Sequence, residues 1–520
     1  MTASAKASAL VFVLFQALYA LTSSGNAFRV PDEFEVYFQV EHLVDAGDLS
    51  VPQTLTIRQG SQSVFFGKFG KDQKPYAPYG PLVAVLALPH HLAGRALAAL
   101  AGVPRAPAGQ GLAWVILVGG VTMLSSATGA ALAVAGFHRA CLALATPPVT
   151  ALVLALLLGG ATVMWPYGAT LYSEAWQAAA LIWAAAFLLN ARRSSAHARA
   201  QVIAAALLLA LGGLVKVTCL IFAPAFVLAV LFDRSLSART RRDVAVALVA
   251  GIALAVAVHM RWNQFRFGAP FDFAYDWAET IPVLPPRAFD LTAVPRGLVV
   301  LLLAPGKSLF LWAPALLLAC AGARRFWRDE PAASIGIGAA LGVGLLFYAA
   351  YLFPEGGYAH GPRNLVPIVP LLLLPAAGAR ARAWPRRVVW ACAGVGATMA
   401  LLATSVSFLE DQAMARRAPG ATQSAYYDQI VPAPGRPANR YRLAYLPFIT
   451  AMSSPGWSQA RALGQGPDYF PFHMLQARRQ LPDGRSIPEW IAFAWPAAWL
   501  LLLAVTAVAV RRLLPSHTDR

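Results

Sequence analysis

The sequence predicts an all-α polytopic membrane protein of about 12–13 transmembrane helices, and three observations support this. Of its 520 residues 58% are hydrophobic and 13% are charged, with a mean hydropathy of +0.56. Apolar segments close to the roughly 17 to 25 residues that a bilayer span requires recur along the chain. Short runs of arginine fall between these segments, as in the cytoplasmic loops of multi-pass proteins.

Thirteen apolar segments are candidates for the bilayer. They cover 7–24, 79–101, 112–136, 148–166, 171–190, 199–215, 217–232, 243–262, 297–321, 333–353, 363–380, 387–408 and 490–511. Segment 79–101 differs from the others because it contains Pro89, His90, His91 and Arg95, which are costly in a helix that faces lipid. We therefore expect this segment to dip into the membrane or lie at its interface without crossing it.

The arginine runs give the expected orientation. They occur at 192–193, 239–242, 324–328, 380–387 and 511–512. Placing all of them in the cytoplasm puts 25–78 outside, provided that segment 79–101 does not cross. If it does cross, the N-terminus is outside and the loop containing Asp32 is cytoplasmic. Most of the net charge of +18 falls in the parts of the chain that this orientation places in the cytoplasm. We therefore expect location in the inner (plasma) membrane and no nucleic-acid partner.

The chain divides into three regions. Residues 1–408 form a transmembrane module, with a first extracytoplasmic loop at 25–111. Residues 409–489 form a polar insert, which we expect to be an ordered extracytoplasmic cap because it is rich in tyrosine as well as proline and arginine. Residues 490–520 supply the last span and a cytoplasmic tail.

Carboxylates gather directly after the first apolar segment. The triplet Pro-Asp-Glu at 31–33 is followed by Glu35. Proline suits a first helical turn and Gly47 suits a C-terminal cap, so we expect an amphipathic helix over 31–46 that lies along the membrane interface. Charges are costly there unless they are used, which makes this the expected site of action. The alternative is a solvated helix whose acids simply favour its N-terminus.

Isolated charged residues recur at the ends of later spans or, for Lys307, about ten residues into one, on the side where Asp32 is expected. They are Glu174, Lys216, Lys307 and Arg363. We expect the acids and bases to converge on one cavity, because fixed cations suit a lipid phosphate and a carboxylate suits proton removal. The alternatives are that the bases reach to the interface from span ends and that Glu174 only favours a helix N-terminus.

The arrangement resembles the GT-C glycosyltransferases, which include the protein O-mannosyltransferases and the lipid A aminoarabinose transferases. The similar stretches are Asp32-Glu33 with Tyr37, the Gly47-Asp48-Leu49 turn, Lys74-Pro75-Tyr76, Tyr79-Gly80-Pro81, the stretch from Trp165 to Glu174, and Gly361-Pro362-Arg363. The resemblance covers most of residues 1–410 as an arrangement and only short stretches by motif.

The resemblance implies a GT-C type bundle with juxtamembrane helices in the first extracytoplasmic loop. It also implies an enzyme that moves a sugar from a polyprenyl-phosphate donor to a hydroxyl of a lipid, glycan or protein. Its active site would face the periplasm or the outside. Direct displacement at the anomeric carbon would invert that centre.

Roles for individual residues follow from the same resemblance and from the chemistry. The general base of the family's first loop corresponds to Asp32, with Glu33 and Glu174 as further catalytic candidates. The candidates for binding the donor phosphate are Lys216, Lys307 and Arg363. The candidates for further substrate contacts are Lys74, Tyr76, Tyr79, Tyr358 and His360.

Metal use and two other functions stay open. Asp32, Glu33 and Glu174 could share a divalent metal, as acids do in the oligosaccharyltransferase branch, although no DxD spacing lies near Glu174. A transporter or flippase for an anionic lipid or solute would also use intramembrane bases. The chain has no paired inverted halves, which disfavours that function. A non-catalytic envelope-assembly subunit would keep the fold without the activity.

Overall fold

The computed structural model is almost entirely helical over the residues that it describes. These are 3–24, 30–56, 67–105, 111–193, 197–274, 288–304, 306–351, 353–354, 356–357, 359–378, 385–405, 469–478 and 486–513. Strands β1 (Lys68–Phe69) and β2 (Pro75–Tyr76) pair in an antiparallel hairpin, with Lys68 opposite Tyr76.

Eight helices in the described ranges are long and apolar enough to cross a membrane. They are α1 (Ala3–Thr22), α3 (Pro81–Leu100), η2 (Val115–Gly119) with α5 (Gly120–Ala143), α9 (Ala198–Val215), α11 (Ala238–Phe267), α16 (Pro331–Ala350), α18 (Arg386–Ser405) and α24 (Glu489–Arg511). Every predicted segment coincides with one or more helices, which confirms the all-α, multi-pass membrane fold.

The other described helices are shorter than these, apart from α8, which has 18 residues like α9. They are α2 (Pro31–Ala46), η1 (Pro52–Thr56), α4 (Leu112–Trp114), α6 (Pro148–Gly160), α7 (Met164–Gly168), α8 (Glu174–Ala191), η4 (Val217–Phe222), α10 (Ala223–Leu231), η5 (Leu291–Ala293), α13 (Val294–Leu302), α14 (Leu309–Trp312), α15 (Leu316–Asp329), η6 (Arg363–Ile368), α17 (Val369–Leu373), η7 (Leu374–Gly378) and α23 (Phe470–Ala477). Proline opens several of them, as its fixed φ and missing N–H favour.

The centre of the bundle is α5, whose most apolar window is 83% buried. It packs against α1, α6 and α8, and α8 in turn packs against α9. Small residues permit the close approach of α5 and α8, because Gly129 faces Trp176 and Gly136 faces Trp183. The last helix, α24, lies at the outer edge and is 17% buried over its apolar window.

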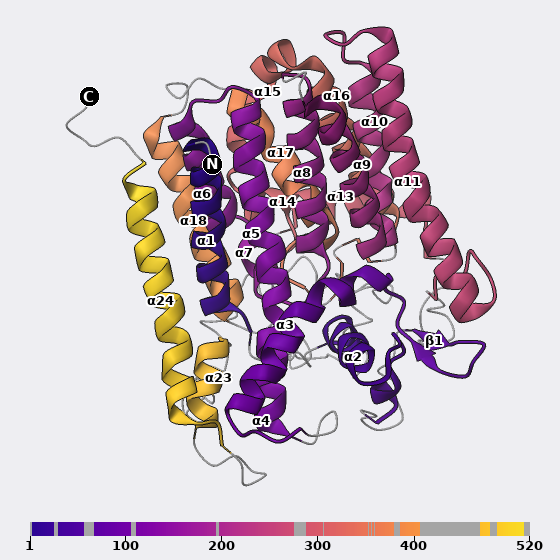
Figure 1. The fold of residues 1–520 in the computed structure, drawn as a ribbon. Coiled ribbons are helices and arrows are strands. Elements are labelled where there is room, and N and C mark those ends of the chain that lie inside the picture. The colour runs from indigo at the N-terminus through magenta and orange to yellow at the C-terminus, as the bar shows by residue number, and fades with distance from the viewer. Residues whose placement is uncertain are drawn as a thin grey trace, which may run out of the picture.

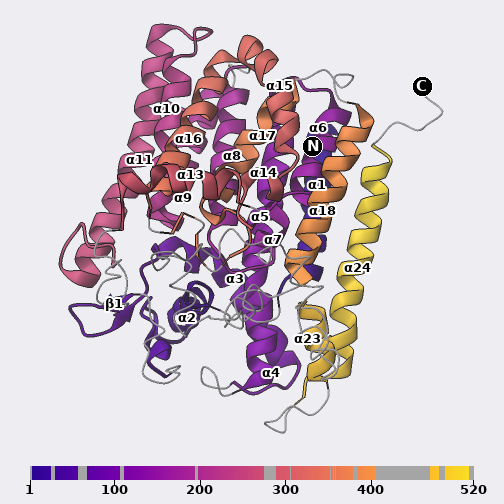
Figure 2. The ribbon, with the colours of Figure 1, turned by 180° about the vertical axis from the view of Figure 1, so that it is seen from behind.

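The first loop covers one end of the bundle. Figures 1 and 2 show α2, α3 and β1 at this end, whereas α1 starts and α24 finishes at the opposite end. Helix α3 lies obliquely beneath the bundle beside α2 and α4, although its length and apolar composition would allow it to span. Its predicted failure to cross the bilayer stays a prediction.

The helix at 31–46 is α2, and Gly47 caps it with φ 76°. Glu33, Glu35 and Gln39 are fully buried, so α2 is not the solvated helix of the alternative interpretation. Its position along the membrane interface stays a prediction. Segment 297–321, which we expected to be one span, is not one continuous helix. It breaks into α13, α14 and α15 around Lys307, whose charge is held by a neighbouring loop.

The predicted cap at 409–489 falls mostly outside the described residues. Its described part includes α23, which packs against α24 and α1. Phe470 is fully buried there, and its N–H donates to Ser23 O at 2.7 Å. The end of the insert is therefore attached to the end of the first helix.

Candidate active site

Four charged side chains from separate parts of the chain form one continuous series of ion pairs. Arg363 Nη2 lies 2.8 Å from Asp32 Oδ1, and Arg363 Nε lies 2.9 Å from Glu174 Oε1. Lys216 Nζ lies 3.0 Å from the same Glu174 oxygen. These distances are typical of charge-assisted hydrogen bonds. We call these four residues the charge array.

Each member of the charge array lies at the end of a helix. Asp32 is in the first turn of α2, and Glu174 is the first residue of α8. Acids are favoured at these positions because the helix dipole is positive there. Lys216 is extended, with φ −153° and ψ 125°, between α9 and η4, and Arg363 opens η6. The array therefore forms where several helices begin or end together.

The charge array runs from the interior towards a more open position. The exposed fraction of the side chain is 1% for Glu174, 7% for Arg363, 16% for Lys216 and 21% for Asp32. A charge as deeply buried as Glu174 is tolerable only when it is paired, and both cations bind it. Asp32 is thus the acid of the array that a substrate can reach most easily.

The guanidinium of Arg363 is fixed on three sides. Besides its two carboxylate partners, it lies 3.9 Å from the centre of the Tyr172 ring, a cation–π contact. Ser126 Oγ donates to Tyr172 O at 2.9 Å, which fixes the backbone that carries the ring. Gly356 approaches so closely that a Cβ atom there would lie 2.5 Å from Arg363 Cβ, and its φ of +81° also requires glycine.

Glu33 does not join the charge array. Its Oε1 accepts a hydrogen bond from the Leu171 N–H at 3.1 Å. Leu171 lies in the turn between α7 and α8, three residues before Glu174. Glu33 thereby ties the start of α2 to the start of α8, and so helps to place Asp32 relative to Glu174.

Lys307 holds the loop that leads to Arg363. Its Nζ donates to Gly357 O at 3.2 Å and also to Ala359 O. In the same loop, the His360 ring stacks on Trp312 at 5.7 Å between centres, and its carbonyl accepts from Tyr167 Oη at 3.0 Å. Lys307 and His360 therefore fix the loop that precedes Arg363.

Lys74 and Tyr76 form side-chain hydrogen bonds within the first loop, and the Tyr76 ring also packs edge-on against Trp262 and Phe267 of α11. Lys74 Nζ lies 2.7 Å from Asp48 Oδ2, and Tyr76 Oη donates to Asp72 at 2.9 Å. Partial burial acts to raise the pKa of Asp48, but hydrogen bonds from Lys74 and Ser50 outweigh it and hold that pKa well below its usual range. These residues shape the hairpin rather than the charge array.

Tyr79 and Tyr358 complete the predicted set of site residues. Tyr79 is buried at the point where the first loop meets α3. Tyr358 lies outside the described residues. Within the described residues, no three or more His, Cys, Asp or Glu side chains gather in a group that could hold a metal ion.

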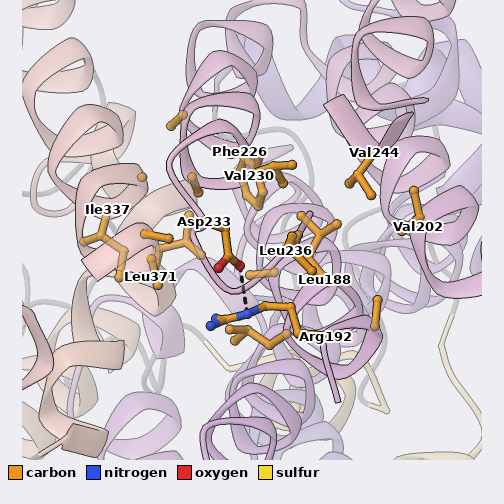
Figure 3. Close-up of a pocket in the computed structure, with 18 of the residues that line it drawn as sticks. Leu188, Arg192, Val202, Phe226, Val230, Asp233, Leu236, Val244, Ile337 and Leu371 are labelled. Carbon is orange, nitrogen blue, oxygen red and sulfur yellow. Dashed lines mark ion pairs between the residues drawn. The ribbon is translucent and has the colours of Figure 1, made fainter. Parts of the chain in front are cut away.

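A separate cavity of about 130 Å³ lies between α8, α9, α10, α11 and α16 (Figure 3). It is lined mainly by alanine, leucine and valine. At its edge, Arg192 Nε lies 2.8 Å from Asp233 Oδ2, and Arg192 Nη1 lies 2.7 Å from Glu330. Arg192 follows the 18 residues of α8 that begin with Glu174, so it lies about 27 Å away at about 1.5 Å per residue. The cavity is therefore distinct from the charge array.

Sequence reasoning gave no individual role to Leu171 or Tyr172, which support Glu33 and Arg363. They precede the candidate acid Glu174 by three and two residues, and this nearness could have pointed to them. His259 in α11 carried no such signal, because a single histidine in an apolar segment is most simply a packing residue. Its hydrogen bond to Gly213 O at 2.7 Å is visible only in the structure.

No family model matches the chain, and no curated protein matches it in sequence. Solved structures do resemble it. The ArnT protein of Cupriavidus metallidurans bound to undecaprenyl phosphate is 16% identical, with a TM-score of 0.47, over 96% of this chain and 76% of that one. The same protein in the apo state is 16% identical, with a TM-score of 0.46, over 91% and 80%.

The oligosaccharyltransferase of Archaeoglobus fulgidus, in a complex with Zn and sulfate, is also similar. It is 13% identical, with a TM-score of 0.45, over 83% of this chain. The match covers 58% of the oligosaccharyltransferase chain. ArnT and this enzyme are GT-C membrane glycosyltransferases, the group that the sequence resembles. At these identities the likeness is one of fold.

Proposed function

We propose that this protein is a membrane glycosyltransferase that moves a sugar from a polyprenyl-phosphate donor to a hydroxyl of its acceptor. The charge array is the observation that supports this proposal. It contains a partly open carboxylate, Asp32, which is paired with Arg363 at 2.8 Å. A second cation, Lys216, is linked to Arg363 through Glu174 at 3.0 and 2.9 Å. Hydroxyl activation needs a base, and departure of a lipid phosphate needs fixed positive charge.

In the proposed reaction, the acceptor oxygen forms a bond to the anomeric carbon while the bond from that carbon to the phosphate oxygen breaks. Asp32 takes the proton of the acceptor hydroxyl. The lipid phosphate leaves with the bonding electron pair, and Arg363 and Lys216 stabilise its charge. One direct displacement of this kind inverts the anomeric centre.

The proposal gives Glu174 and Lys307 supporting roles. Glu174 is buried between Arg363 and Lys216, and its Oε1 pairs with both, which holds the two cations close to each other. Lys307 holds the loop before Arg363 through the carbonyls of Gly357 and Ala359. Neither role requires contact with the sugar.

The same geometry makes the base depend on the donor. Asp32 Oδ1 accepts a hydrogen bond from Arg363 Nη2 at 2.8 Å, so the guanidinium occupies this oxygen in the described arrangement. A donor phosphate bound to Arg363 would compete with Asp32 for the guanidinium. In the proposed sequence the carboxylate is released for the acceptor hydroxyl only after the donor has bound.

The candidate acids Asp32, Glu33 and Glu174 do not form a shared metal site within the part of the chain that the structure describes. Glu174 Oε1 faces two cations, and Glu33 Oε1 accepts a backbone hydrogen bond from Leu171. No step of the proposed reaction is therefore assigned to a metal ion. A chelator tests this directly, because it should leave the transfer rate unchanged.

The test uses cells with and without the gene, whose envelope lipids and glycans are compared by mass analysis. Loss of a single sugar, restored by the wild-type gene and by Gly338→Ala but not by Asp32→Asn, is the expected result. Gly338 is a suitable control because a Cβ atom there meets nothing within 4 Å. Unchanged glycans, with an anionic lipid accumulating on one leaflet, would instead support a transporter.

A further inference from the structure

We propose that Gly80 and His259 are positioning residues that set the place of Lys216 by holding the end of α9 against the first loop. The proposal rests on the proposed function for the role of Lys216 as a phosphate ligand. It concerns residues outside the charge array, and it gives the Tyr79-Gly80-Pro81 turn a physical purpose.

Lys216 lies at a break between two helices. Its N–H donates to Gly212 O at 3.2 Å, which closes α9, and its carbonyl accepts from Cys219 N at 2.9 Å inside η4. Its own backbone is extended. The direction of the side chain therefore depends on where the last turn of α9 is held, because no helical hydrogen-bond pattern continues through the break.

His259 holds that last turn from α11. Its Nε2–H donates to Gly213 O at 2.7 Å, and the residue is 4% exposed. Gly213 is three residues before Lys216, so its carbonyl is among the last four of α9 that lack a helical partner. A buried carbonyl without a partner is costly, and His259 supplies that partner.

Gly80 holds the same turn from the first loop. A Cβ atom on Gly80 would lie 2.1 Å from Leu214 O and 3.2 Å from His259 Cε1. The backbone of Gly80, with φ −66°, is one that any residue adopts. Glycine is therefore required here for the close approach and not for its conformational freedom. A larger residue has to displace Leu214, which is two residues before Lys216.

One helix fixes both contacts. Arg266 follows His259 by seven residues on α11, which places the two on one face of that helix. Arg266 Nη1 donates to Ala77 O at 2.6 Å, and its carbonyl accepts from Lys71 N at 2.8 Å. The first loop, which starts with Asp32, is thus anchored to α11 just before it reaches the end of α9. Asp32 and the Gly80 contact with the end of α9 therefore both belong to this loop.

The first measurement is the affinity of the purified protein for undecaprenyl phosphate. Gly80→Ala and His259→Leu should each weaken binding by about tenfold, the loss of one charge-assisted contact. His259→Gln keeps an N–H donor and should therefore recover part of the lost affinity. In a Lys216→Gln background the same changes should cause no further loss. Gly338→Ala and His138→Gln, both outside the array and α9, serve as controls.

The second measurement does not depend on the lipid. The rate at which Lys216→Cys reacts with a small thiol reagent should change several-fold when Gly80→Ala is added, and should not change with Gly338→Ala. An equal reaction rate in both backgrounds would overturn the positioning role. An equal loss of affinity with and without Lys216 would also overturn it. If the wild-type protein binds no undecaprenyl phosphate, the proposed function is refuted but the positioning role is not. The thiol reaction still tests the positioning role in that case.

Discussion

At the residue scale, Asp32 and Arg363 are the pair on which the proposed chemistry depends. They are 331 positions apart in the sequence and 2.8 Å apart in the structure. Arg363 donates to Asp32 and to Glu174 at the same time. Only the planar guanidinium, with N–H donors in fixed directions, can make both hydrogen bonds. Three substitutions separate the role of the base from that of the cations.

Asp32→Asn should lower turnover by about 10² to 10⁴, because it keeps the size of the side chain and removes the basic oxygen. It should also bind undecaprenyl phosphate at least as tightly as the wild type, since it removes the competitor for Arg363. Steady-state kinetics and binding to purified protein measure both effects. Asp243→Asn, an exposed acid elsewhere, is the matched control. A wild-type turnover in Asp32→Asn would mean that the base lies elsewhere.

Lys216→Gln should weaken binding of undecaprenyl phosphate by about ten- to a hundredfold, the effect of losing a contact worth roughly 1.5 to 3 kcal/mol. Arg363→Lys should be nearly as severe, because an ammonium cannot bridge two carboxylates as the guanidinium does. Thermal unfolding of each variant separates lost binding from lost folding. Unchanged affinity in both variants would show that the cations serve only the packing of Glu174.

At the scale of the element, α2 shows how an acidic helix can be built into a protein interior. Tyr37 Oη donates to Glu41 Oε1 at 3.4 Å, and Gln53 Nε2 donates to Glu41 Oε2 at 3.1 Å. These contacts do not fully replace water. Burial raises the pKa of Glu41 above its ordinary value of 4.5.

Since Glu41 binds its proton more tightly in the folded state than in the unfolded state, its contribution to stability should be fully present below pH 4.5 and should be lost as pH rises through the raised pKa. Glu41→Gln removes this dependence and can keep both hydrogen bonds. We expect its unfolding temperature to exceed that of the wild type by about one to a few degrees at pH 8 and to match it near pH 4.5. Glu489→Gln, at an exposed position, should show no such pH-dependent difference. A lower unfolding temperature for Glu41→Gln at pH 8 would contradict the sign.

At the scale of the whole molecule, the two ends of the bundle differ in character. Figure 1 shows the first loop with β1 at one end and the connection between α10 and α11 at the other. The connection carries Arg234 and leads into Arg239, Arg241 and Arg242. The charge array lies at the opposite end of the bundle, the end that the first loop covers. This polarity fits a site on the extracytoplasmic side.

A cysteine at Lys71 should therefore react in intact cells with a thiol reagent that does not cross membranes, and one at Arg234 should react only after the cells are opened. Both positions are exposed. The background should carry Cys320→Ser, because Cys141, Cys219 and Cys392 are buried and Cys320 is exposed. Labelling of position 234 alone in intact cells would invert the orientation and exclude a donor on the outer leaflet.

Local patterns in the sequence determined much of this protein. The thirteen apolar segments, the helix at 31–46 with its glycine cap, and the charged residues at helix ends were all readable, because hydropathy and capping act over a few residues. The resemblance to GT-C glycosyltransferases was carried by short motifs around Asp32 and Arg363.

The tertiary structure alone decided which charges meet and which faces are covered. It paired Arg363 with Asp32 and Glu174, assigned Lys307 to loop carbonyls, buried the polar face of α2, and placed Gly80 and His259 on the end of α9. Hydropathy records only whether a side chain leaves water. It does not record which distant segment supplies its partner, because that depends on how the helices pack against one another.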